Sequence, residues 1–380
     1  MCKITSMGKT KKKVLIALSG GIDSAVSAYL LIKKGYYVEA AFMKNWTSQE
    51  GLLKNECPWL SDRRDALRVA AFLGIKLHTL DFEKEYQKRV MKYFFEEYKQ
   101  GRTPNPDVMC NKEIKFKLLY NWARYKRFDY LATGHYAQAH EAWSMKQGAK
   151  DRKGFKFQVP SFKLMRSADE LKDQTYFIYN IKTQQLPHLL FPIGGMKKAQ
   201  VRSLARKIGL PNAEKKESMG LCFVGRIRLK DFLEQKIRAR PGQIINQEGK
   251  VVGRHHGLHI YTIGQRQGIN LGAKGPYYVF KKDLKHNRLY VTNNPDDARL
   301  LTREVDIHSM NWINQVGLRA KGLGLSGRYR HQGELAPLMI SKIKNDLYRV
   351  IFKTPQKAVA SGQSLVLYKG KECLGGGIIA

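Results

Sequence analysis

The chain has 380 residues, of which 43% are hydrophobic and 11% aromatic, so two or three globular domains are expected and a disordered chain is excluded. No apolar run approaches the roughly 18–20 residues that cross a membrane, and residues 14–18 are too few for a signal-peptide core of about 7–15, so a cytoplasmic protein is predicted. The 68 Lys and Arg residues against 32 Asp and Glu give a formal charge of +36, which predicts a nucleic-acid partner without distinguishing DNA from RNA.

The first third of the chain predicts strands that alternate with helices, a pattern typical of βαβ units and of a parallel sheet covered on both faces. Ligands of such sheets bind beyond the carboxyl ends of the strands, where SGGIDS, FMKNW and TGHYA are expected to lie. The predicted strands are residues 14–18, 37–43, 75–82 and 128–137; the predicted helices are residues 23–34, 63–73, 86–98 and a further segment that ends near residue 125.

The rest of the chain changes character. Residues 139–158 are expected to form an excursion or a β-ribbon, and residues 196–211 an amphipathic helix. From about residue 244, turns and β-branched or aromatic runs predict a small β-domain and then a barrel. The predicted fold class is α/β, with an N-terminal parallel-sheet domain over residues 1–215, a central β-rich domain over residues 216–296 and a C-terminal β-barrel over residues 297–380.

The stretch SGGIDS, residues 19–24, stands between a predicted strand and a predicted helix. Its two glycines let backbone N–H groups converge on an anion at the positive end of the helix dipole. The hydroxyls of Ser19 and Ser24 add donors, and Asp23 is placed to approach a magnesium ion. The stretch resembles the PP-loop of the ATP pyrophosphatase superfamily, whose members cleave ATP between the α and β phosphates to adenylate a carbonyl oxygen. Amide ligases, tRNA thiolases and lysidine synthases all share such a loop.

The five cysteines are odd in number and form no CxxC pair, which argues against a secreted disulfide framework and against a structural zinc site. Cys110 follows Asp107 in GRTPNPDVMCNKEIKF, a proline-containing loop that runs into a helix. Cys222 lies in ESMGLCFVG, flanked by Lys215, Lys216 and Arg226, and cations near a cysteine can lower the pKa of its thiol from about 8.5 toward neutrality. For a cysteine taken singly, a buried filler thiol is the alternative.

Taken together, these motifs resemble the tRNA 2-thiouridylase family, the bacterial MnmA/TrmU family, nearly from end to end. The matching stretches also include ATGHYA, LKDQTYFIY, HHGLHIYTIGQRQG and SGQSLVLY. Ile22 stands where the loop commonly has valine, and the inserts near residues 145–156 and 319–326 are local departures. The resemblance implies ATP-dependent 2-thiolation of the wobble uridine of tRNA.

The resemblance also implies a role for individual residues. Cys222 would carry a persulfide, Cys110 would be the nucleophile and Asp107 a nearby acid or base. No resident metal site is implied; ATP and Mg²⁺ are the expected cofactors. The ATP site would comprise Ala17, Leu18, Ser19, Gly20, Gly21, Ile22, Asp23, Ser24, Met43 and Gly134. The tRNA contacts would be Asn105, Pro106 and Asp107 at the target base, with His135, Lys172, Asp173, Gln174, Arg328, Tyr329 and Gln363.

The implied partners are the tRNAs for lysine, glutamate and glutamine, and a cysteine desulfurase or sulfur-carrier protein that donates sulfur. Two other functions stay open: a PP-loop amide ligase acting on a small metabolite, and an RNA-binding protein that has lost its activity. An iron–sulfur cluster held by Cys110, Cys222 and Asp107 is also open, although two thiolates are fewer than the usual four ligands. Taken alone, His135 is as compatible with a structural role as with a tRNA contact. Lys172 and Arg328, taken alone, are compatible with ordinary charged residues on the surface.

Overall fold

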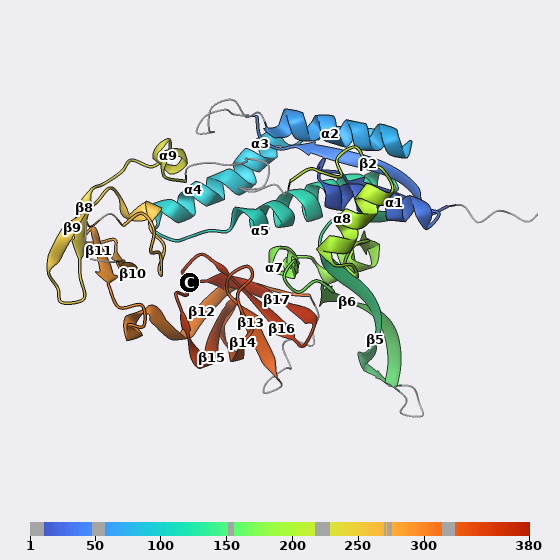
Figure 1. Ribbon diagram of the computed structural model, residues 1–380. Helices are drawn as coiled ribbons and strands as arrows, with labels where there is room; N and C mark the ends of the chain where they lie inside the picture. The colour runs from blue at the N-terminus through green and yellow to red at the C-terminus, as the bar shows by residue number, and fades with distance from the viewer. Residues whose placement is uncertain are drawn as a thin grey trace, which may run out of the picture.

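The computed structural model describes residues 11–47, 58–150, 156–216, 229–269, 271, 276–313 and 324–380, without the side chains of residues 58 and 143–160. Its N-terminal part is built on five parallel strands in the order β3-β2-β1-β4-β7 (Figure 1). These strands are β1 (Lys13–Ala17), β2 (Tyr37–Lys44), β3 (Leu77–Asp81), β4 (Tyr130–Ala132) and β7 (Leu189–Leu190).

Two hydrophobic clusters cover the two faces of this sheet. Side chains alternate along β1, so Val14 and Ile16 pack in one cluster while Leu15 and Ala17 pack in the other. The Val14 face is covered by α1 (Ile22–Lys33), α2 (Pro58–Leu73) and α8 (Lys198–Lys207). The opposite face is covered by two long helical segments, each interrupted by π-helix: α3 (Glu83–Tyr86), η1 (Gln87–Met91) and α4 (Lys92–Lys99), then α5 (Pro106–Cys110), η2 (Asn111–Leu119) and α6 (Tyr120–Tyr125).

The central part is a four-stranded sheet in the order β10-β11-β8-β9. Its strands are β8 (Gly242–Ile245), β9 (Val251–His255), β10 (Tyr278–Asp283) and β11 (Arg288–Thr292). All neighbours pair antiparallel except β8 and β11, which are parallel. In Figure 1 this sheet lies beyond the ends of α4 and α5, to one side of the C-terminal barrel.

The C-terminal part is an antiparallel barrel in which β12 pairs with both β15 and β17 and so closes the sheet. Its strands are β12 (Leu301–Trp312), β13 (Leu325–Arg328), β14 (Ala336–Lys344), β15 (Leu347–Lys357), β16 (Ser364–Lys369) and β17 (Glu372–Ile379). The hairpin of β5 (Ala137–Lys150) and β6 (Lys156–Arg166) pairs with β17 and projects from the body (Figure 1). The predicted α/β fold class is therefore confirmed, and the segment expected as an excursion or ribbon is a β-ribbon.

Short elements join these parts and complete a shared core. Tyr176 and Tyr179 pack with Val366 and Cys373 of the barrel in the same cluster as Leu15 of the parallel sheet. The short elements are α7 (Thr175–Ile178), α9 (Leu229–Glu234) and the 3₁₀ turns η3 (Thr183–His188), η4 (Leu258–Ile260) and η5 (Ala298–Leu300). Among the residues that the structure describes, every helix is too short or too polar to span a lipid bilayer.

Candidate active site

The strand order of the parallel sheet defines where a ligand binds. From β1 the chain proceeds to β2 and β3 on one side, whereas β4 and β7 lie on the other, so the order reverses between β1 and β4. Ligands of open α/β sheets bind in the crevice at such a reversal, beyond the carboxyl ends of the strands. SGGIDS follows β1 there, and Thr133 to His135 follow β4.

The loop after β1 is built for close approach of a ligand to the backbone. Gly20 has φ +78°, and an added Cβ would lie 2.3 Å from the carbonyl oxygen of Asp62. Ser24 donates from Oγ to the carbonyl oxygen of Gly21 at 3.0 Å and accepts from the N–H of Ser19 at 3.2 Å. These bonds fix the loop at the start of α1, where the first N–H groups of the helix have no intrahelical acceptor. The arrangement fits an anionic phosphate group.

Gly134 closes the other side of the crevice. A Cβ at Gly134 would lie 2.7 Å from the backbone nitrogen of Ser24, so only glycine permits this contact between the β4 loop and α1. Met43, predicted to lie near adenine, is buried at the end of β2 and packs in the same cluster as Ala17. The binding roles of these residues stay predictions.

Asp23, in the first turn of α1, is held by two side chains. Its carboxylate accepts from Lys198 Nζ at 2.7 and 2.8 Å and from the hydroxyl of Tyr136 at 2.9 Å. Tyr136 belongs to the loop after β4, and Lys198 is the first residue of α8. Neither contact is predictable from the sequence, because Lys198 and Tyr136 are 175 and 113 positions away from Asp23.

Cys110 and Asp107 belong to α5, which packs beneath the sheet. Asn105 caps this helix, its side-chain oxygen accepting from the N–H of Val108 at 3.1 Å. Cys110 is 0% exposed and packs in the same cluster as Ala17 and Met43 at the carboxyl ends of β1 and β2. The predicted nucleophile is therefore buried in the core, and the π-helix η2 that follows it carries further buried side chains.

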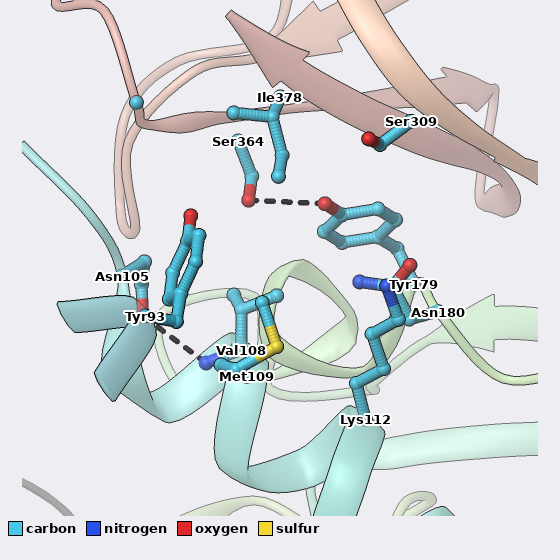
Figure 2. A pocket seen from close by; sticks show the side chains of 11 residues that line it. Tyr93, Asn105, Val108, Met109, Lys112, Tyr179, Asn180, Ser309, Ser364 and Ile378 are labelled. Carbon is cyan, nitrogen blue, oxygen red and sulfur yellow. Dashed lines mark hydrogen bonds between the residues drawn. The ribbon is translucent and has the colours of Figure 1, made fainter. Parts of the chain in front are cut away.

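Figure 2 shows a small pocket between α5 and the C-terminal barrel. Asn105, Val108, Met109 and Lys112 line its lower side, and Ser364 and Ile378 of the barrel line the upper side. These helix positions recur every three to four residues and so share one face of the helix. Cys110 and Asp107 do not line this pocket and belong to the other side of α5. Asn105 thus faces this pocket, whereas Asp107 and Cys110 lie on another side of α5, and the roles of all three stay predictions.

The barrel holds the segment that leads into α5. Gln363 donates from Nε2 to the carbonyl oxygen of Thr103 at 2.7 Å, and the N–H of Thr103 donates to the carbonyl oxygen of Ser361 at 2.8 Å. Gly362 permits this approach, because an added Cβ would lie 2.9 Å from the nitrogen of Thr103. The hydroxyl of Thr103 also lies 3.0 Å from that of Thr262 in the central part of the chain. All three parts of the molecule therefore meet at this loop.

Several predicted tRNA contacts are buried. Arg328 donates to Asp173 at 3.1 Å, and their side chains are 6% and 0% exposed; Arg166 lies 3.4 Å from the same carboxylate. Tyr329 is buried as well, and its hydroxyl donates to the carbonyl oxygen of Lys357. Gln174 accepts from the N–H of Tyr136 at 2.9 Å. Lys172 is half-buried next to this network. Their contacts with tRNA stay predictions, and the structure gives Asp173 and Arg328 each other as partners.

His135 follows β4 and is buried. Its Nδ1 lies 2.8 Å from the hydroxyl of Thr133, and its ring packs beside Phe116 and Phe191. Burial, reinforced by the charge of Lys115, holds the pKa of His135 well below its ordinary value, so its imidazole is neutral at neutral pH. In this position His135 is part of the packing behind the end of β4.

Cys222 and the rest of ESMGLCFVG lie outside the described residues, so the structure does not test the predicted convergence of the two thiols. The described stem before that motif is tied to the PP-loop. Asn212 donates from Nδ2 to the carbonyl oxygen of Gly20 at 2.9 Å. Lys215 pairs with Asp62 at 2.7 Å and with Asp65 at 2.6 Å. Residues 212–215 are therefore held against the PP-loop and α2.

Three family models match this chain in succession. A tRNA methyl transferase HUP domain matches residues 12–226, a tRNA methyl transferase PRC-barrel domain residues 230–293, and an aminomethyltransferase beta-barrel domain residues 302–379. A tRNA-specific 2-thiouridylase MnmA from Pseudomonas fluorescens is 42% identical over 97% of the chain and 94% of its own length. The tRNA-specific 2-thiouridylase MnmA from Buchnera aphidicola is 42% identical over 98% of the chain and 98% of its own length. The chain belongs to the tRNA-specific 2-thiouridylase family.

Among solved structures, a 4-thiouridine synthetase in complex with RNA and bound ATP aligns with 59% of the chain and 50% of its own length, at 18% identity and a TM-score of 0.36. NMN synthetase from Francisella tularensis aligns with 61% of the chain and 81% of its own length, at 20% identity and a TM-score of 0.33. Alignments this weak add nothing to the family membership.

No group of three or more His, Cys, Asp or Glu side chains is placed to hold a metal ion within the described part of the chain. Because Cys222 is outside that part, a cluster ligated by Cys110, Cys222 and Asp107 stays an alternative. A magnesium ion at Asp23 stays a prediction: its carboxylate, a ligand type that Mg²⁺ accepts, lies in the first turn of α1 and is paired with Lys198.

Proposed function

We propose that this protein is an ATP-dependent sulfurtransferase that converts the wobble uridine of tRNA to 2-thiouridine. The observation that carries the proposal is the 42% identity, over 97% of the chain, to an enzyme named tRNA-specific 2-thiouridylase. The PP-loop at the reversal of the sheet and the formal charge of +36 support it, since the reaction needs ATP and a polyanionic substrate.

The chemistry explains why the site needs both ATP and thiols. The C2 carbonyl of uridine is a poor electrophile, and its oxygen is a poor leaving group. In the proposed first step, this oxygen attacks the α-phosphorus of ATP, and pyrophosphate departs into the cradle formed by Ser19 to Ser24. Mg²⁺, held at Asp23, would offset the negative charge of the phosphates. AMP is then the leaving group at C2.

Sulfur enters in the proposed second step. The outer sulfur of a Cys222 persulfide attacks C2, AMP leaves, and a disulfide joins the base to Cys222. The Cys110 thiolate attacks the Sγ of Cys222, which releases 2-thiouridine and leaves a Cys110–Cys222 disulfide for an external thiol to reduce. Asp107, three residues before Cys110, accepts the thiol proton. The covered position of Cys110 keeps this thiol from premature reaction.

The proposed partners follow from the same chemistry. A cysteine desulfurase, or a sulfur carrier loaded by one, supplies the persulfide. The substrates are the tRNAs for lysine, glutamate and glutamine, and the reaction takes place in the cytoplasm. Asn105 to Asp107 meet the target base, while His135, Lys172, Asp173, Gln174, Arg328, Tyr329 and Gln363 contribute to the tRNA-binding region directly or through the loops that they hold.

The decisive test is mass analysis of nucleosides from tRNA incubated with the protein, ATP, Mg²⁺ and a sulfide source. We expect 2-thiouridine only when ATP is present. With a persulfide donor instead of sulfide, Cys222→Ser is expected to form pyrophosphate with tRNA but no 2-thiouridine. If AMP is released only when an amine is added, and tRNA is not needed, the protein is an amide ligase instead. If the protein does not bind ATP, an RNA-binding protein without enzymatic activity is favoured.

A further inference from the structure

Lys198, which is 175 positions away from Asp23 in the sequence, places its ammonium group next to the PP-loop by pairing with the Asp23 carboxylate. Lys198 Nζ lies 2.7 and 2.8 Å from the two carboxylate oxygens of Asp23. The side chains are 13% and 31% exposed, so the pair is partly accessible to solvent and does not lie in the hydrophobic core.

The position of Lys198 is fixed from several sides. Its backbone N–H donates to Asp169 at 2.8 Å, which anchors the first turn of α8. Its Nζ also lies 5.7 Å from the centre of the Tyr136 ring, whose hydroxyl donates to Asp23. Helix α8 packs against α1 through Val201 and Ala205. The backbone of Lys198 is thus held while its four-carbon stem remains able to redirect the charge.

The charge at this position matters because of what the PP-loop is built to bind. An anion held by the N–H groups at the start of α1 would lie next to the Asp23 carboxylate, and the two negative charges would repel each other. Lys198 removes this conflict in one of two ways. It either stays on Asp23 and neutralises it, or it moves to the phosphate and leaves Asp23 to a cation.

We propose that Lys198 is a phosphate-binding residue that Asp23 holds in place until the nucleotide arrives. When ATP binds, Lys198 donates to a phosphate oxygen, as the lysine of a Walker loop does, and Asp23 turns to the accompanying Mg²⁺. The proposal rests on the proposed function for its ligand, ATP, and adds a residue that no motif of the chain identified. A purely structural ion pair is the competing explanation.

The test measures binding of pyrophosphate and of ATP to the full-length protein by calorimetry, with and without Mg²⁺. We expect Lys198→Met to weaken both ligands about tenfold or more, the usual effect of losing a charge-assisted hydrogen bond. Lys207→Met, at the exposed end of the same helix, removes the same charge and is expected to bind like wild type. Adenosine affinity is expected to be the same in all variants.

Asp23→Asn separates the two explanations. Without Mg²⁺ it is expected to bind pyrophosphate more tightly than wild type, because Lys198 is released, and the double variant is expected to bind about tenfold or more weakly than Asp23→Asn, because it lacks the lysine contact. If the double variant binds as tightly as Asp23→Asn, or if Lys198→Met binds like Lys207→Met, Lys198 only neutralises Asp23 and the proposal is wrong. Lys198→Arg is expected to recover part of the affinity, and thermal unfolding of each variant reports whether it folds.

The same data distinguish failure of the proposal from failure of the proposed function. A wild-type protein that binds ATP but never thiolates tRNA would contradict the proposed sulfurtransferase activity. The binding measurements on the variants would still decide the role of Lys198. A wild-type protein that binds neither ATP nor pyrophosphate would overturn both.

Discussion

The side-chain amide of Gln363 lies 2.7 Å from the carbonyl oxygen of Thr103 and so joins the C-terminal barrel to the loop that leads into Cys110. The adjacent backbone bond from Thr103 to Ser361 strengthens the connection. Through these two bonds the barrel positions the start of α5. Gln363, expected from sequence to contact tRNA, therefore holds the loop that leads into α5.

We expect Gln363→Ala to lower kcat about 3- to 10-fold, the effect of losing one neutral hydrogen bond that orients reacting groups, while tRNA affinity changes little. Single-turnover thiolation and a tRNA binding assay separate the two quantities. Gln356→Ala is the matched control, because that amide bonds within its own strand, to Thr354. A rise in the tRNA Kd with unchanged kcat would instead make Gln363 a tRNA contact.

The pair of Asp173 and Arg328 is expected to govern stability. Because both side chains are buried, Arg328→Met leaves a carboxylate with fewer partners and is expected to lower the free energy of unfolding by about 3–5 kcal/mol. Chemical denaturation measures this loss. Arg349→Met, which breaks the exposed pair with Asp306, is expected to unfold close to wild type. Weaker tRNA binding by Arg328→Met without any loss of stability would contradict the structural role.

The burial of Cys110 predicts protection from alkylation. We expect Cys110 to react slowly with iodoacetamide in the protein alone and faster when tRNA and ATP are bound, because its chemistry requires that its cover open. Cys373 is expected to stay protected in both states, since burial in the core raises the pKa of its thiol strongly. Peptide mass spectrometry follows both sites in one sample. Fast labelling of Cys110 without substrates would show that it is not covered in solution.

The lowered pKa of His135 predicts a stability that falls in acid. An unfolded histidine binds a proton near pH 6.5, whereas the buried ring resists protonation. The contribution of His135 is therefore fully present above about pH 6.5 and declines by about 1.4 kcal/mol per pH unit below it, until its folded pKa is reached. Thermal unfolding between pH 7.5 and 5.5 should show a smaller decline for His135→Gln than for wild type, with His140→Gln as the exposed control. An equal decline would refute this assignment.

The sequence predicted the features that depend on local pattern. The apolar run before Ser19 and the glycines after it specify the strand, the loop and the start of α1, so the crevice could be placed from sequence. The contacts of Lys198 with Asp23 and of Arg328 with Asp173 could not, because each joins residues more than 150 positions apart. The π-helical geometry after Cys110 was missed too, since the side-chain pattern there is compatible with an ordinary helix.

The most direct test follows the oxygen that thiolation removes. Transcribed tRNA carrying oxygen-18 at C2 of uridine is incubated with the protein, ATP, Mg²⁺ and a sulfur donor, and the AMP formed is analysed by mass spectrometry. We predict one AMP bearing the heavy oxygen for every 2-thiouridine produced. Heavy oxygen found in water or in pyrophosphate, with only ordinary oxygen in AMP, would contradict adenylation of the carbonyl.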